Sequence, residues 1–254
     1  MELNILGCSG GVGKDRLTTS LCVDGDILLD AGTGVGELSD EKLAAIRHVF
    51  ITHSHLDHIA CLPLLVERQF AMGEPPLEIY ALQETIDALK THVFNWSIWP
   101  DFAELPSPDQ PSMHYTPVRP GESYDIDGRI IEPIEVNHVV PAVGYYVISG
   151  EGSFCYSGDT STCDTLWDAL NKKSTLDLLI VEVGFADKDI EVAHAALHYC
   201  PSLLADDLTK LKHEPSVAIS HLKPGDEDLT YTEICQAITD REIIRLRHGD
   251  LFQL

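Results

Sequence analysis

The sequence is short of positive charge, and this shortage excludes one broad class of partner. Its 254 residues contain 17 lysines and arginines against 41 aspartates and glutamates, which gives a formal net charge of -24. A surface this acidic repels polyanions at a distance. We therefore expect no long nucleic acid as a partner, whereas a small anion drawn to a local metal centre is compatible with this charge.

Long apolar runs and targeting signals are also lacking. No stretch reaches the roughly 20 apolar residues that span a bilayer, and residues 1–6 form a strand-like pattern with no basic and apolar leader. Hydrophobic residues make up 44% of the chain, which is enough for a sizeable core. We expect a soluble, cytoplasmic protein with no membrane partner.

The cysteines lack the spacing of a zinc site or of a disulfide framework. There are seven of them, scattered along the chain, and none forms a CxxC motif. This pattern favours reduced, mostly buried thiols that bind no metal.

The glycine-rich segment 7–13 lacks the features of a phosphate-binding loop. No Gly-Lys-Ser/Thr ending follows it, and no helical pattern opens after it. We expect a tight turn that brings the backbone close to a functional site.

Histidine, in contrast, is concentrated in one short stretch. Three of the 12 histidines lie in residues 53–58, which read His-Ser-His-Leu-Asp-His. The buried-strand pattern of residues 48–51 precedes this motif, and the helical pattern of residues 59–70 follows it. The motif is therefore predicted to lie on a loop between a strand and a helix, where scaffolds commonly hold their chemistry.

The spacing within this motif predicts two metal positions. In an extended segment His53 and His55 point the same way, so they can hold one metal together. Asp57 and His58 lie past the bend, at the start of the helix, and face a second position. Imidazole together with carboxylate suits zinc, iron, manganese or cobalt.

Other predicted strands also end in residues that can bind a metal. The strands predicted at residues 129–136, 153–156 and 217–220 are followed by His138, Asp159 and His221. In layered α/β proteins functional sites collect at strand ends, so these residues and the motif predict one shared site. Asp30 also ends a predicted strand, where it is either a turn cap or a partner for a metal-binding histidine.

Residues 95–121 form an unusual segment in which six prolines are interspersed with tryptophan, phenylalanine and tyrosine. The segment is too long for an ordinary connection, so it predicts a lid or a dimer-contact excursion. Its aromatic side chains could stack on a nucleobase. A local packing cluster is the favoured alternative.

Turn residues predict three hairpins. The paired strands are 18–23 with 26–29, 143–149 with 153–156, and 242–247 with 251–254. Residues 176–183 predict a buried strand, and the polar residues 186–191 predict a connection.

On these residues the sequence resembles the metallo-β-lactamase superfamily. The HxHxDH motif at 53–58, His138, the Gly158-Asp159-Thr160 turn and His221 occur in the family's order and span nearly the whole chain. The resemblance implies an α/β fold, a four-layer αβ/βα sandwich with two mixed β-sheets flanked by helices. It also implies one metallo-hydrolase domain over residues 1–254, with residues 95–121 as an insertion.

The resemblance further implies a ligand set for two divalent transition-metal ions. The implied ligands of one ion are His53, His55 and His138. Those of the other ion are Asp57, His58 and His221, and Asp159 bridges the two. Zinc is the expected metal, with manganese or iron as alternatives. Asp57 is also expected to be a catalytic residue.

Within the superfamily the run 53–59 is similar to the signature of class II cyclic-nucleotide phosphodiesterases, as are residues 6–11, 29–33 and 197–204. Cys61 departs from that signature, which prefers glycine or serine there. This resemblance implies hydrolysis of a small anionic substrate, a 3′,5′-cyclic nucleotide, to a 5′-nucleoside monophosphate. A hydroxide activated by two metals would attack the phosphorus in line. His198 is the expected proton donor, with His194 as a weaker rival and a structural helix-start histidine as the alternative.

Endoribonucleases of the tRNase Z type share these metal motifs and leave a second function open. Such an enzyme needs a basic surface and an RNA-gripping arm, which neither the net charge nor residues 95–121 provide. A hydrolase of thioesters, lactams or lactones and a metal-binding module without turnover are further alternatives. Phosphodiesterases and tRNase Z enzymes of this superfamily often form homodimers, so the resemblance predicts a homodimer.

Overall fold

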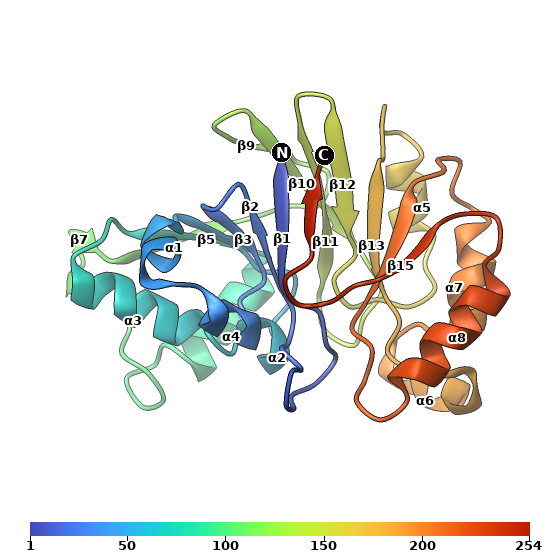
Figure 1. Cartoon of the computed structure of the whole chain (residues 1–254). Coiled ribbons are helices and arrows are strands. Elements are labelled where there is room, and N and C mark those ends of the chain that lie inside the picture. The colour runs from blue at the N-terminus through green and yellow to red at the C-terminus, as the bar shows by residue number, and fades with distance from the viewer.

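Two seven-stranded β-sheets face each other, with helices on their outer faces, in a computed structural model that describes residues 1–254 (Figure 1). The first sheet has, in spatial order, the strands β16 (Leu251–Gln253), β1 (Glu2–Gly7), β2 (Ser20–Val23), β3 (Ile27–Leu29), β4 (His48–Phe50), β5 (Leu77–Ala81) and β8 (Met113–Pro117). The second has β15 (Ile243–Arg245), β14 (Ser216–Ser220), β13 (Leu178–Glu182), β12 (Gly152–Tyr156), β11 (Val143–Ser149), β10 (Arg129–Glu135) and β9 (Tyr124–Ile126).

Both sheets are mixed. The strands from β16 to β3 are antiparallel and those from β3 to β8 are parallel. In the second sheet β9 to β12 are antiparallel, and β12 to β15 are parallel. A short separate pair, β6 (Pro106–Ser107) and β7 (Gln110–Pro111), completes the strands.

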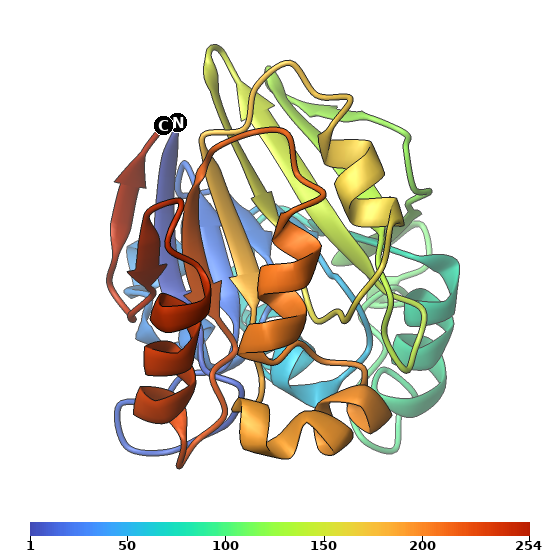
Figure 2. The same cartoon turned by 90° about the vertical axis from the view of Figure 1, so that its right-hand side faces the viewer.

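The helices form the two outer layers. Those of the first half are η1 (Thr33–Glu37), α1 (Asp40–Ala45), α2 (Leu56–Ile59), α3 (Leu62–Met72) and α4 (Gln83–His92). Those of the second half are α5 (Thr165–Leu170), η2 (Asp187–Asp189), α6 (Ile190–Ala196), α7 (Pro201–Leu208) and α8 (Glu227–Ala237). In the side view, α5, α7 and α8 cover the outer face of the second sheet (Figure 2). The predicted four-layer αβ/βα sandwich is confirmed.

Three apolar clusters hold the four layers together. The one between the sheets contains Phe50, whose ring stacks on Tyr80 at 4.2 Å and meets Tyr145 of the opposite sheet edge-on at 5.5 Å. The other two clusters lie between each sheet and its helices and hold 21 buried residues apiece. Each fully buried large apolar side chain contributes about 1.5–3 kcal/mol of burial free energy, so this core can hold a fixed site at its edge.

The prediction of a final hairpin is wrong. Strand β15 runs parallel to β14 in the second sheet, whereas β16 pairs antiparallel with β1 in the first. The two termini therefore meet, and the Met1 amino group donates to the Leu254 carbonyl at 2.7 Å. The other two predicted hairpins, β2 with β3 and β11 with β12, are confirmed.

Three further predictions need correction. The helix predicted at 59–70 is two helices, α2 and α3, because α3 begins anew at Leu62 with Pro63 in its first turn. The connection predicted at 186–191 contains η2 and the start of α6. Residues 95–121 are not only an excursion, because β8 lies within them and extends the first sheet alongside β5.

The aromatic side chains of 95–121 serve mainly as packing. Phe102 is buried in the core, and Trp99 and Tyr115 pack partly buried against the same cluster, whereas Trp96 is exposed. All seven cysteines are free thiols, but only Cys22, Cys155 and Cys200 are buried, so the expectation that most of them are buried is wrong. None of the helices has both the length and the apolar composition needed to cross a membrane.

Candidate metal centre

The residues predicted from the sequence meet at one edge of the sandwich, where strands of both sheets end. His53 and His55 follow β4 in the first sheet. His138, Asp159 and His221 follow β10, β12 and β14 of the second sheet. Segments far apart in the chain therefore supply one cluster of side chains.

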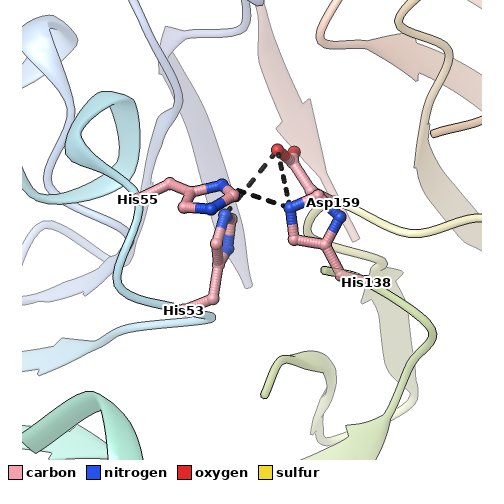
Figure 3. A group of neighbouring side chains, drawn as sticks. All are labelled: His53, His55, His138 and Asp159. Carbon is pink, nitrogen blue, oxygen red and sulfur yellow. Dashed lines mark hydrogen bonds and ion pairs between the residues drawn. The ribbon is translucent and has the colours of Figure 1, made fainter. Parts of the chain in front are cut away.

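The first group consists of His53, His55, His138 and Asp159 (Figure 3). One ligand-capable atom from each lies within 4.8 Å of the others. His138 Nε2 is 3.2 Å from His55 Nδ1, and His53 Nε2 is 3.7 Å from Asp159 Oδ2. His138 Nε2 lies 4.0 Å from the same carboxylate oxygen.

The second group consists of Asp57, His58, Asp159 and His221, again with ligand atoms within 4.8 Å of one another. His58 Nε2 is 3.2 Å and His221 Nδ1 is 3.1 Å from Asp159 Oδ1. Asp57 Oδ2 lies 3.9 Å from each of these two rings. Asp159 thus turns one oxygen toward each group, as expected of a carboxylate that joins two cation positions.

Unpartnered nitrogens show that this site fits cations. His53 Nε2, His58 Nε2 and His221 Nδ1 are buried and have no hydrogen-bond partner. A buried polar atom left without a partner costs about 1–3 kcal/mol, so three in one place point to a missing partner. Imidazole nitrogens with a shared carboxylate are a donor set for divalent transition metals. The assignment of the seven ligands stays a prediction.

Most of these rings are held in the neutral form that binds a metal. Burial lowers the pKa of His138 to about 4 and that of His221 to about 3, and it also lowers the pKa of His53 and His55. These neutral rings offer a lone pair to a cation. His58 differs: burial opposes its charge, but the carboxylates of Asp159 and Asp30 raise its pKa. A bound cation would take the place of that proton.

Hydrogen bonds behind the rings fix which nitrogen faces the site. His58 Nδ1 donates to Asp30 Oδ2 at 2.6 Å, and His138 Nδ1 donates to the Leu197 carbonyl at 3.0 Å. Thr52 Oγ1 lies 3.0 Å from His53 Nδ1. Of the two roles considered for Asp30, the structure realises that of a partner for a histidine. Such partners orient ligands and raise metal affinity.

The glycine-rich segment supports His221, as expected of a close backbone approach. The His221 N–H donates to the Cys8 carbonyl at 2.7 Å. A Cβ at Gly10 would lie 2.4 Å from the His221 carbonyl oxygen, so only glycine fits there. His221 itself has a φ of 59°, a left-handed conformation that costs a non-glycine residue about 1–3 kcal/mol. The contacts with the loop hold it in this conformation.

Sequence reasoning missed Glu182, which forms a third group with Asp159 and His198. Glu182 Oε1 accepts from His198 Nδ1 at 2.7 Å, while its Oε2 is buried without a partner. Burial opposes the charge of His198, but Glu182 raises its pKa. The signal in the sequence was a carboxylate near the end of a strand that is otherwise entirely apolar.

The His198 ring lies against the metal-site rings. Its centroid is 5.2 Å from that of His221, nearly parallel to it, and 5.1 Å from that of His138. His194, the weaker rival, is exposed on α6 and belongs to none of the three groups. Of these two histidines, His198 is therefore the one that lies beside the metal-site rings.

Comparison with known proteins gives one family and consistent relatives. Residues 26–225 match the family described as "Beta-lactamase superfamily domain". A "Probable 3′,5′-cyclic-nucleotide phosphodiesterase" of Yersinia pestis is 30% identical, over 88% of this chain and 78% of the relative. A "Ribonuclease Z" of Pyrobaculum calidifontis is 26% identical, over 75% of each chain.

Solved structures agree on the fold. The metallo-β-lactamase fold protein YhfI from Bacillus subtilis superposes with a TM-score of 0.80 at 19% identity, over 99% of both chains. Unliganded yeast PDE1 superposes with a TM-score of 0.81 at 20% identity, again over 99% of both chains. At these identities the likeness concerns the fold alone.

Proposed function

Because this chain belongs to the metallo-β-lactamase superfamily, we propose that it is a dinuclear metal-dependent phosphodiesterase that hydrolyses 3′,5′-cyclic nucleotides to 5′-nucleoside monophosphates. The superfamily and the His/Asp cluster support a metal-dependent hydrolase. The observation that carries the proposal is Asp159, whose two oxygens face two groups of histidines with unpartnered nitrogens. The 30% identical relative named for this activity supports the substrate class.

In this proposal His53, His55 and His138 hold one ion, while Asp57, His58 and His221 hold the other and Asp159 joins them. Zinc is the proposed metal, with manganese or iron as alternatives. When bound, such ions lower the pKa of water and neutralise charge on a phosphoryl oxygen.

The chain's own side chains would manage the protons. Asp57 is proposed to accept a proton from the attacking water, because its carboxylate is 30% exposed whereas that of Asp159, the other carboxylate among the proposed ligands, is 3% exposed. The imidazole of His198 can donate a proton to the leaving oxygen. Glu182 accepts a hydrogen bond from Nδ1 of His198, so Nε2 of this ring is the nitrogen left to face the substrate. Glu182 is thus a positioning residue in this mechanism.

Replacing His198 with glutamine is expected to lower kcat by about 10²–10⁴-fold, the usual contribution of a general acid. Metal content, measured by atomic emission, should not change, because His198 is not a proposed ligand. His194→Gln is the matched control, since it removes an exposed imidazole four residues away. Full turnover by the His198→Gln protein would leave this histidine with only a structural role.

One substrate panel tests the proposed function. Purified protein loaded with zinc, manganese or iron is offered cyclic AMP, cyclic GMP, bis(p-nitrophenyl) phosphate, a precursor tRNA and, for the other hydrolase classes, a thioester and a lactone. We expect turnover of a cyclic nucleotide with release of the 5′-monophosphate. Hydrolysis of none of the phosphodiesters, or of a thioester or lactone in their place, would refute the proposal.

A tRNase Z-like 3′-processing endoribonuclease is the second candidate, favoured by the relative named Ribonuclease Z. The surplus of 41 acidic over 17 basic residues opposes binding of a long polyanion. Cleavage of precursor tRNA with no cyclic-nucleotide turnover would reverse the order of the two candidates. The homodimer remains a prediction that size-exclusion chromatography can test.

A further inference from the structure

Lys223 carries a positive charge that no carboxylate neutralises. Its Nζ lies 3.4 Å from Nε2 of His221, two residues earlier. Three of the nine lysines, Lys173, Lys188 and Lys210, form ion pairs within 4.0 Å, and Lys223 is one of the six that form none. The five other lysines without an ion pair are all exposed, whereas Lys223 is half-buried beside the metal-site rings.

The surroundings of Lys223 hold it in place. A Cβ at Gly10 would lie 3.0 Å from Lys223 Cγ, so the lysine stem packs directly on the glycine-rich loop. Its Nζ lies 5.4 Å from the centroid of the Phe185 ring, which is a cation–π distance. Pro224, the next residue, packs against Gly11, where an added Cβ would lie 3.0 Å from the proline ring. These contacts keep a usually flexible side chain beside the site.

The same contacts place the ammonium next to the proposed proton donor. The Phe185 ring that lies under Lys223 also meets the His198 ring at 5.7 Å. His198 in turn stacks on His221. Lys223 and His198 therefore both contact His221, on the side of the proposed metal centre where Asp57 and Asp159 face that ring.

We propose that Lys223 binds the anionic group of the substrate and makes this site selective for phosphodiesters over neutral esters and lactones. The ammonium would donate a charge-assisted hydrogen bond to a phosphoryl oxygen, which would be the anionic partner that Lys223 lacks within the protein. Neutral substrates would gain nothing from it. The inference rests on the proposed function only in placing a phosphodiester at this centre, and it does not depend on a cyclic nucleotide being the natural substrate.

Binding of inorganic phosphate to the zinc-loaded protein tests this role by isothermal titration calorimetry. Lys223→Gln is expected to raise the Kd for phosphate about 10- to 100-fold, the usual loss for a hydrogen bond to a charged group. Lys223→Arg keeps the charge and should stay within about threefold of the wild type. The KM for bis(p-nitrophenyl) phosphate should follow the same order. Zinc content is measured in every variant.

The matched control is Lys188→Gln, which removes a cation that is already paired with Asp226. It should leave the Kd for phosphate unchanged. An unchanged Kd in Lys223→Gln, no phosphate binding by the wild type, or loss of zinc in both Lys223 variants would each overturn the inference. If the wild type hydrolyses no cyclic nucleotide while Lys223→Gln still weakens phosphate binding, the proposed substrate fails and the inference stands.

Discussion

Asp159→Ala is expected to lower kcat/KM by roughly 10³-fold or more and to reduce the bound metal from two ions to one or none. Asp159 is the only carboxylate that lies in all three groups of potential ligands. Cations in such a site are worth several kcal/mol of transition-state charge stabilisation, and each 1.36 kcal/mol is a factor of ten in rate. Metal stoichiometry by atomic emission and steady-state kinetics on bis(p-nitrophenyl) phosphate measure the two effects.

Asp177→Asn is a suitable control for this experiment. Asp177 accepts from the Ser153 N–H and hydroxyl at 2.8 Å each, outside the three groups of potential ligands. Its replacement can affect folding but should not change the metal content. If the Asp159→Ala protein bound two ions as tightly as the wild type, Asp159 would not join the two positions and the proposed ligand set would be wrong.

The candidate site was largely predictable because its chemistry is encoded by residue type. Histidine and aspartate concentrated at 53–58, with His138, Asp159 and His221 at strand ends, have few roles other than metal binding. The structure brings all of them together. Glu182 was missed because a single acidic residue at the end of an apolar strand is a weak signal, and its role depends on His198, 16 residues away in the sequence but in contact in the fold.

The fold was predictable in its elements and class but less so in its strand pairing. Alternation of apolar residues identifies a strand, yet it does not say which strand is the neighbour. This is why the sequence predicts one hairpin for β15 and β16, which are adjacent along the chain but belong to different sheets. The strand β8 was overlooked because prolines surround it and Pro117 ends it, which only an edge strand tolerates.

Asp30 illustrates an alternative that the sequence left open and the structure resolves. Its carboxylate is fully buried and accepts four groups: the His58 Nδ1–H, the Thr52 N–H and hydroxyl, and the Tyr156 hydroxyl. Tyr156 lies on β12 and Asp30 follows β3, so this contact also joins the two sheets. A turn cap would need only the local N–H, whereas this set connects the core to the metal centre.

Asp30→Asn is therefore expected to affect both stability and metal binding. Removing one charge of the buried Asp30–His58 pair should lower the free energy of unfolding of the metal-free protein by about 3–5 kcal/mol. Loss of the carboxylate behind His58 should weaken metal affinity by about 10–100-fold. Urea denaturation with a chelator present measures the first effect, and competition with a zinc-binding dye measures the second.

Tyr156→Phe separates the two effects, because it removes one hydrogen bond to the same carboxylate and leaves its charge and its contact with His58 in place. It should cost about 1–2 kcal/mol of unfolding free energy and leave zinc affinity within about threefold of the wild type. If Asp30→Asn bound zinc as tightly as Tyr156→Phe, the charge of Asp30 would stabilise the core without tuning His58. Its 2.6 Å contact with that ring would then be structural only.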